Sequence, residues 1–166
     1  LLSIQELYQY SARVRRKFAE KLAQMPWDEI NKNREASFHS MKNIMLHVID
    51  NEDWMVNWVV KNKGKEYKRE KKSDDYIDMK MVLDHLSDVE NKTQLYLKGM
   101  TEDDLKARVR LTLSSGREFD LTVEECFLQS FTEQLYHLGE LIALMWQENI
   151  EPPQMQWFYN NPREER

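Results

Sequence analysis

Glu133 and His137 are two residues whose types and spacing suit metal binding. They lie four positions apart in a largely apolar stretch, residues 131–146, which predicts one long helix. On a helix this spacing places both side chains on the same face, one turn apart, where they can share one ion. In the simpler alternative, the carboxylate and the imidazole bond each other or face water, because an unpaired polar group is costly to bury.

His47 is a third candidate ligand and lies on another predicted helix. A histidine among large apolar side chains is either a metal ligand or a core histidine whose hydrogen bonds are satisfied within the protein. Asp50 follows three positions later and could accept a hydrogen bond that orients the ring of His47. The predicted inward stripe of this helix comprises Ile44, His47, Asn51, Trp54, Met55 and Trp58.

Helices are the elements that the composition predicts around these residues. The chain has 166 residues, enough for one domain with a sizeable core, and only four Gly and four Pro among abundant Leu, Met, Glu and Lys. The spacing of the apolar residues predicts four helices, over residues 2–25, 40–62, 74–98 and 123–149. No internal repeat is found, so we expect an all-α four-helix bundle in a single domain, residues 1–166.

Capping signals mark the ends of these predicted helices. Capping-box patterns begin the first helix at Ser3 and the fourth at Thr122. Gly64 predicts the end of the second helix, and Ser73 or Asp74 the start of the third. The predicted boundaries therefore depend on turn chemistry as well as on apolar spacing.

The two longest connections between the helices differ in character. Residues 107–123 alternate between apolar and polar on either side of Ser114-Ser115-Gly116, which predicts a small β-hairpin between the third and fourth helices. Two strands alone are marginally stable, so this hairpin must pack on the bundle. The basic run at residues 61–72 favours a solvated crossover linker rather than a patch that attracts an anionic substrate.

Charge, cysteine content and hydropathy narrow the function classes. A net charge of −5 argues against nucleic-acid binding as the main role. We find no signal peptide and no apolar run of about eighteen residues, so we expect neither export nor membrane insertion. Cys126 is the single cysteine, which excludes an internal disulfide and suits the reducing cytoplasm.

Three parts of the chain together resemble a known family. They are the run ASFHSMKNIMLHV at residues 36–48, the predicted hairpin, and the run HLGELIAL at residues 137–144, which is followed by IEPP at residues 150–153. In this order they resemble the DinB/YfiT-like superfamily, whose members are regarded as metalloenzymes, and the resemblance covers nearly the whole chain.

The resemblance implies a four-helix bundle that holds a divalent metal, zinc or nickel, between three histidines. His47 matches the histidine of the second helix and His137 the last of an H-x-x-x-H pair on the fourth, whereas Glu133 replaces the middle histidine. Two histidines and one carboxylate form a known zinc set and also the ligand set of non-haem iron(II), so iron or manganese also fits. The anionic ligand lowers the net charge of the site by one, so bound water should be less acidic than with three neutral histidines.

The resemblance also implies a class of activity. It suggests thiol-dependent transfer or metal-assisted hydrolysis, acting on a small thiol or another small molecule, in a cytoplasmic homodimer. His47, Glu133 and His137 would hold the ion, with Asp50 orienting His47 and Glu140 orienting His137. The alternative is a non-enzymatic, stress-related binding or interaction module with a structural, degenerate or absent metal site. An open coordination position favours the enzyme, and a fourth protein ligand favours a structural site.

Overall fold

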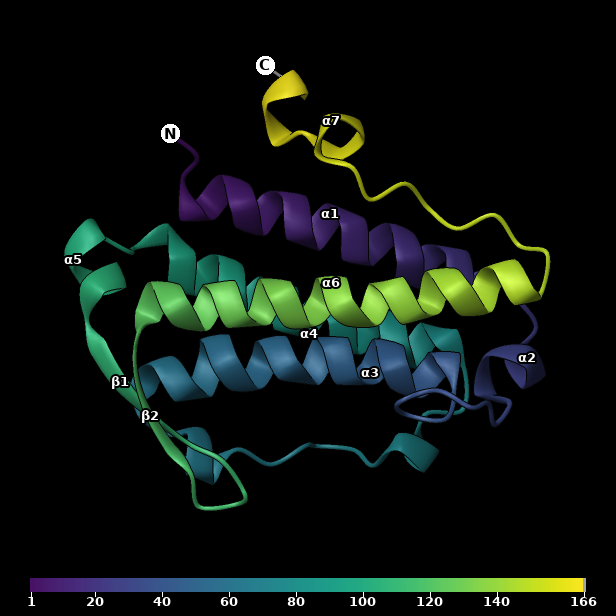
Figure 1. The fold of residues 1–166 in the computed structure, drawn as a ribbon, viewed down its shortest axis with the longest axis horizontal. Coiled ribbons are helices and arrows are strands. Elements are labelled where there is room, and N and C mark those ends of the chain that lie inside the picture. Colours follow the sequence, from purple (N-terminus) through teal and green to yellow (C-terminus); the bar gives the residue numbers. More distant parts are fainter. Residues whose placement is uncertain (166) are drawn as a thin grey trace.

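Four long helices form the bundle that the apolar spacing predicts. The computed structural model describes residues 1–165, in which the long helices are α1 (Ile4–Ala23), α3 (Met41–Glu52), α4 (Met79–Lys98) and α6 (Val123–Gln147). In Figure 1, α1, α6 and α3 lie side by side, with α4 behind them. Both α1 and α3 contact α4 and α6, so the four helices enclose a common interior. The all-α four-helix bundle is therefore confirmed.

Short helices lie between the long ones and after the last of them. The α-helical pieces are α2 (Trp27–Asn31), α5 (Glu102–Lys106) and α7 (Trp157–Asn160), and 3-10 turns occur at Val59–Lys61, Gly64–Glu66, Ser73–Asp75 and Pro162–Glu165. The first of them, α2, falls in a segment where no helix was predicted, and its Ile30 is completely buried in the core. Among the helices described here, none is both long enough and apolar enough to cross a membrane.

The two predicted capping boxes are present. The side chain of Ser3 accepts a hydrogen bond from the backbone of Glu6, whose carboxylate accepts from the Ser3 backbone in return. Thr122 and Glu125 make the same reciprocal pair at the start of α6. These bonds satisfy amide groups that a helix leaves unpaired at its N-terminus.

Of the two other predicted boundaries, one is correct and one is wrong. The helical segment after α3 ends at Asn62, as predicted, although Asn62 and not Gly64 adopts the left-handed conformation (φ 57°). The third long helix begins several positions later than predicted, at Met79, because Tyr76 and Asp78 have extended backbones. Asp78 is the cap, since its side chain accepts a hydrogen bond from the first turn. The ring of Tyr76 packs into the core before the helix starts.

The second long helix departs from α-geometry after Glu52. It continues as a π-helical turn, Asp53–Trp58, before the 3-10 turn that closes it. A π turn holds more residues than an α turn, so later side chains rotate away from the predicted stripe. Trp54 and Trp58 are consequently only half-buried, while Val59 is completely buried.

A buried ionic network joins all four long helices. Arg15 on α1, with 1% of its side chain exposed, pairs with Glu52 at the end of α3 and with Glu90 on α4. The same guanidinium donates to Gln134 Oε1 on α6 over 3.2 Å. A buried guanidinium needs such partners, because an unpaired charge in the interior is strongly destabilising.

The predicted hairpin is also present. Strands β1 (Arg108–Thr112) and β2 (Glu118–Thr122) pair antiparallel, with Val109 opposite Leu121 and Leu111 opposite Phe119. Figure 1 shows the hairpin at one end of the bundle. Its buried residues Val109 and Leu111 pack into a core cluster with α6 residues, as an isolated hairpin requires.

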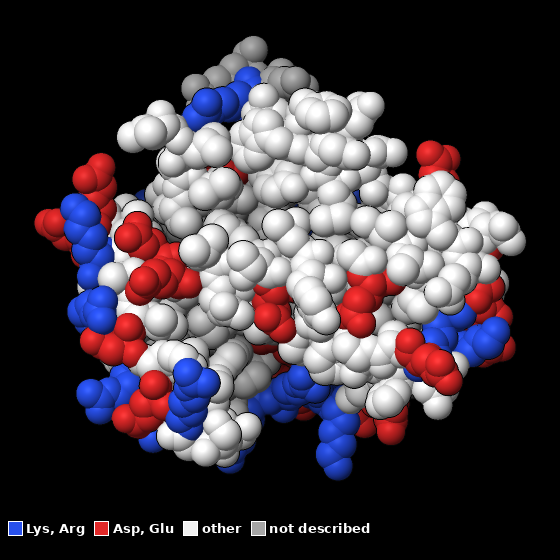
Figure 2. Space-filling view, viewed as in Figure 1, with Lys and Arg blue, Asp and Glu red and all other residues white. Residues whose placement is uncertain are grey.

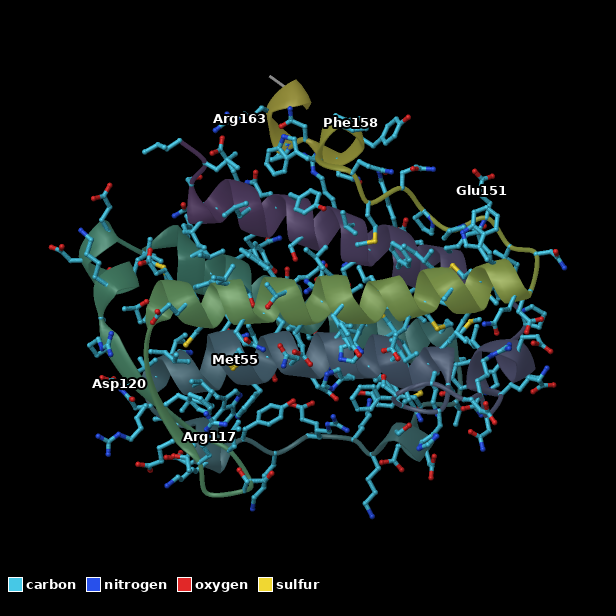
Figure 3. All side chains as sticks on the ribbon, viewed as in Figure 1. Met55, Arg117, Asp120, Glu151, Phe158 and Arg163 are labelled. Carbon is cyan, nitrogen blue, oxygen red and sulfur yellow. The ribbon has the colours of Figure 1, made fainter. Side chains whose placement is uncertain are left out.

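The C-terminal segment runs along α1. Tyr10 donates a hydrogen bond to the carbonyl of Met155 over 2.6 Å, and its ring lies 5.2 Å from that of Trp157. Figure 3 shows Phe158 and Arg163 on this segment, on the outer side of α1. Phe158 is 62% exposed, so only part of the aromatic tail packs on the bundle.

Candidate metal centre

His47, Glu133 and His137 lie together in the bundle. α3 carries His47, and it packs against α6, which carries the other two residues one turn apart. Glu133 Oε1 lies 3.2 Å from His47 Nε2 and 3.1 Å from His137 Nε2. One ligating atom from each residue can be chosen so that all three lie within 4.8 Å of one another. The predicted convergence of these side chains is confirmed.

These separations suit ligands that share one metal ion. Atoms bound to an ion at about 2.0–2.2 Å lie roughly 2.8–3.6 Å from each other in octahedral or tetrahedral geometry. The two measured carboxylate–imidazole distances, 3.2 and 3.1 Å, fall inside this range. The donor set of two imidazoles and one carboxylate is one that zinc and iron(II) both accept. The residues present therefore fit a divalent ion.

Glu140 fixes the hydrogen position on the His137 ring. Its Oε2 lies 2.6 Å from His137 Nδ1, and Ser37 holds the carboxylate through Oγ (2.7 Å) and its backbone N–H (3.2 Å). A carboxylate only accepts hydrogen bonds, so Nδ1 carries the hydrogen. In the neutral ring, Nε2 then has a free lone pair. That lone pair faces an oxygen of Glu133. Two acceptors in this position require a cation between them, either a proton or a metal ion.

Burial and hydrogen bonding set the charge states of two groups in this centre. Burial lowers the pKa of His47, and it outweighs the hydrogen bond that the ring can donate to Glu133, which acts in the opposite direction. A neutral imidazole is the form that binds a metal. Burial opposes ionisation of Glu140, but hydrogen bonds from Ser37 and His137 still hold its pKa below the usual value.

The centre is open on one side. The side chains of His47 and Glu133 are 19% and 29% exposed, whereas that of His137 is only 5% exposed. His47 also lines a hollow of about 110 Å³ that is described further below. Within residues 1–165, no fourth histidine, cysteine, aspartate or glutamate joins the group. Three protein ligands and an accessible side are typical of catalytic rather than structural metal sites.

Comparison with known proteins places the chain in a family. A model of the DinB family matches residues 2–165. The chain belongs to the DinB family. Two solved structures are similar: the DinB-like protein YjoA of Bacillus subtilis (17% identity, TM-score 0.68, covering 92% of this chain and 96% of that one), and a DinB-like protein of Bacillus cereus ATCC 10987 (18% identity, TM-score 0.67, covering 91% and 94%). At these identities the likeness shows the fold alone. No curated protein matched the chain.

Asp50 does not have the role predicted for it in this DinB-family chain. Its Oδ1 accepts a hydrogen bond from His85 Nε2 over 2.8 Å, and its Oδ2 pairs with Arg69 Nε over 2.9 Å. Both oxygens are thereby engaged by α4 and by the linker after α3 rather than by His47. The prediction that Asp50 orients His47 is wrong, because partners from two other segments compete for its short side chain.

Two residues of the centre were missed by the sequence analysis as site residues. Ser37 holds Glu140, and the ring of Phe38 stacks on His47 with centroids 4.0 Å apart. Both lie in the loop before α3, where His39 has a positive φ of 65° and Ser40 caps the helix. The only available signal was their place in the run of residues that resembles the DinB/YfiT-like superfamily, since their residue types alone indicate no site.

Cys126 is not part of the centre. It is completely buried in the core cluster near the hairpin. Burial raises the pKa of its thiol to about 11, so the thiol is neutral at physiological pH. Its position is that of a small buried hydrophobic residue and not of a reactive nucleophile.

Proposed function

We propose that this DinB-family protein binds one divalent metal ion through His47 Nε2, Glu133 Oε1 and His137 Nε2, and uses it to activate a small thiol for transfer to an electrophilic substrate. The observation that carries the proposal is the single carboxylate oxygen facing two imidazole nitrogens at 3.2 and 3.1 Å. Because His137 donates its Nδ1 hydrogen bond to Glu140, its Nε2 lone pair faces the Glu133 oxygen, and a cation is needed between these two acceptors.

The chain's own residues have distinct tasks in this proposal. Glu140, held by Ser37, keeps the hydrogen on Nδ1 of His137 and leaves Nε2 as the ligand. The stacked ring of Phe38 fixes the plane of His47 and covers one of its faces from water. The open side leaves coordination positions for a second molecule.

Activation of a thiol suits this ligand set better than activation of water. When bound, the ion lowers the pKa of a thiol or a water molecule that takes a free position. A free thiol starts at a pKa of about 8.5 and water at about 15.7. Because the carboxylate of Glu133 reduces the positive charge of the site, a modest lowering is expected, which is enough to ionise a thiol at neutral pH.

The test is the spectrum of cobalt(II)-loaded protein during titration with 2-mercaptoethanol. A thiolate on cobalt(II) gives an intense charge-transfer band, and we expect this band to appear with an apparent pKa below that of the free thiol. Glu133→Ala should abolish it, and His39→Asn should retain it, because His39 is exposed and asparagine tolerates its positive φ. Glu133→His restores three histidines and should keep or tighten zinc binding.

The same experiment addresses the non-enzymatic alternative. A protein that binds cobalt(II) but gives no thiolate band at any pH would have a closed or structural site, and thiol activation would be refuted. A protein that binds no metal after chelator treatment and reloading would be a degenerate member of the family, and the whole proposal would fail.

A further inference from the structure

A small hollow with basic residues adjoins the proposed metal centre. Its volume is about 110 Å³, and its lining comprises Phe38, Asn43, Leu46, His47, Asp50, Arg69, Lys71, Ser73 and Tyr76. The lining thus combines a proposed metal ligand with two cationic side chains from the linker after α3. Figure 1 shows this linker running beneath α3, and Figure 2 shows Lys and Arg side chains along the same lower edge.

Arg69 is held in place by a relay of polar groups. Its Nε pairs with Asp50 Oδ2 over 2.9 Å, and Asp50 Oδ1 accepts from His85 Nε2 over 2.8 Å. The side chain of Asp50 is 10% exposed and that of Arg69 is 50% exposed. The ion pair uses Nε, so the two terminal nitrogens of this oriented guanidinium can take another partner. A guanidinium held in this way is suited to a planar, two-oxygen anion.

Lys71 adds a second positive charge to the hollow. Its Nζ lies 5.9 Å from the centre of the Tyr76 ring, which places the ammonium beside the lining phenol. Burial raises the pKa of Tyr76 to about 12, so the phenol is neutral and can donate a hydrogen bond. Asp50 is the one acidic residue of the lining, and it is paired with Arg69. The lining therefore has a net positive charge.

The hollow and the metal centre meet at His47. Its ring lines the hollow, while its Nε2 lies 3.2 Å from Glu133. An anion seated on Arg69 would therefore belong to a molecule whose other end can reach the metal centre.

We propose that this hollow is a carboxylate-binding subsite, in which Arg69 and Lys71 hold the carboxylate end of the small thiol whose sulfur is activated at His47, Glu133 and His137. The volume of about 110 Å³ is well below the roughly 300–1,000 Å³ of a site for a whole drug-sized ligand, so it takes an end group and not an entire molecule. The location of the sulfur rests on the proposed function, whereas the carboxylate subsite does not.

The first test compares two thiols of matched length on cobalt(II)-loaded protein. The probes are 3-mercaptopropionate and its uncharged counterpart 3-mercaptopropan-1-ol, each titrated while the charge-transfer band is recorded. We expect the acid to bind about tenfold more tightly, as one charge-assisted contact to a guanidinium provides. Equal affinities for the two thiols would overturn the subsite and leave the proposed function standing.

Variants separate the subsite from general attraction by the basic linker. Arg69→Met and Lys71→Met should each remove most of the preference for the acid and leave binding of the alcohol unchanged. Arg69→Lys keeps the charge and loses the planar fork, so it should restore only part of the preference. Lys68→Met removes an exposed charge of the same linker outside the lining and should retain the preference. A loss as large in Lys68→Met as in Arg69→Met would refute a specific site.

A measurement on metal-free protein distinguishes failure of the subsite from failure of the metal centre. Propionate titrated into the metal-free protein should shift the NMR signal of the Arg69 Nε–H group, and propan-1-ol should not. If no thiol gives a cobalt band but propionate still shifts this signal, the proposed function fails and the subsite stands. If propionate leaves the signal unchanged, the subsite is refuted whatever the metal does.

Discussion

Asp50 and Glu140 show at the residue scale what spacing can and cannot predict. Each carboxylate follows a candidate histidine by three positions, and both were predicted to orient that histidine. Glu140 does so for His137, supported by Ser37, whereas Asp50 is drawn to His85 and Arg69. Spacing along one helix identifies a neighbour, but it carries no information about competing partners from other segments.

This contrast gives a direct prediction for the two carboxylates. Glu140→Ala should weaken zinc binding about 10- to 100-fold, because the His137 ring loses the group that fixes its hydrogen and its orientation. Asp50→Ala should leave zinc affinity unchanged. Competition with a chromophoric chelator measures both, and far-ultraviolet circular dichroism checks that each variant is folded. Equal weakening in the two variants would place Asp50 in the metal centre after all.

The buried thiol of Cys126 gives a prediction about pH. Burial raises its pKa to about 11, above the value of about 8.5 for a free thiol. A raised pKa in the folded state means that the stabilising contribution is complete below the unfolded pKa and is lost as pH rises towards the folded one. Between pH 8 and pH 11, the free energy of unfolding should therefore fall more in the wild type than in Cys126→Ala. Parallel curves in urea denaturation would contradict the burial argument.

At the element scale, most errors occurred where a helix begins, ends or changes its geometry. The apolar spacing located all four long helices, and the capping boxes located the starts of α1 and α6 correctly. The π turn after α3 could not be predicted from a pattern of 3.6 residues per turn, and it rotates the two tryptophans out of the expected stripe. Asp78 caps α4, and not Ser73 or Asp74 as predicted, because Tyr76 is buried in an extended conformation before the helix begins.

The network that joins the long helices should dominate the effect of single charge removals on stability. Glu52→Gln leaves the buried guanidinium of Arg15 with a weakened partner, and we expect a loss on the order of 3–5 kcal/mol in the free energy of unfolding. Asp120→Asn breaks the surface pair with Arg108 on the hairpin, where both side chains are more than half exposed, and should change the free energy of unfolding far less.

Urea denaturation at neutral pH measures both variants. Similar losses in the two would mean that the buried network contributes no more than an exposed ion pair. The hairpin variant is a suitable control, since Figure 3 shows Asp120 on the hairpin, away from α1 and the C-terminal segment.

At the scale of the whole molecule, the bundle and the three converging residues could be predicted, and the surroundings of the centre could not. The apolar spacing predicts that His47, Glu133 and His137 face a shared interior. This requires α3 to pack on α6, which it does. The linker at residues 61–72 was expected to be solvated, yet Arg69 and Lys71 line the hollow beside His47. Such long-range placement depends on how a loop folds back, for which periodicity gives no signal. The cytoplasmic location and the homodimer stay predictions.

Metal binding should stabilise the entire bundle, because its ligands come from two packed helices. A ligand at 100 times its dissociation constant adds about 2.7 kcal/mol to the free energy of unfolding. For a chain of this size we expect zinc to raise the melting temperature by roughly 5–10 °C. Differential scanning calorimetry of chelator-treated protein with and without zinc measures this shift. Glu133→Ala should show little or no shift, and an undiminished shift in that variant would mean that zinc binds elsewhere.

The most direct test of the metal centre is X-ray absorption at the zinc edge of the zinc-loaded protein. We expect one zinc per chain, with nitrogen and oxygen ligands at about 2.0–2.2 Å and the scattering pattern of two imidazoles. One imidazole should disappear in His47→Ala and none in His39→Asn. A spectrum with two imidazoles in both variants, or with none in the wild type, would contradict the assignment of His47, Glu133 and His137 as the ligands.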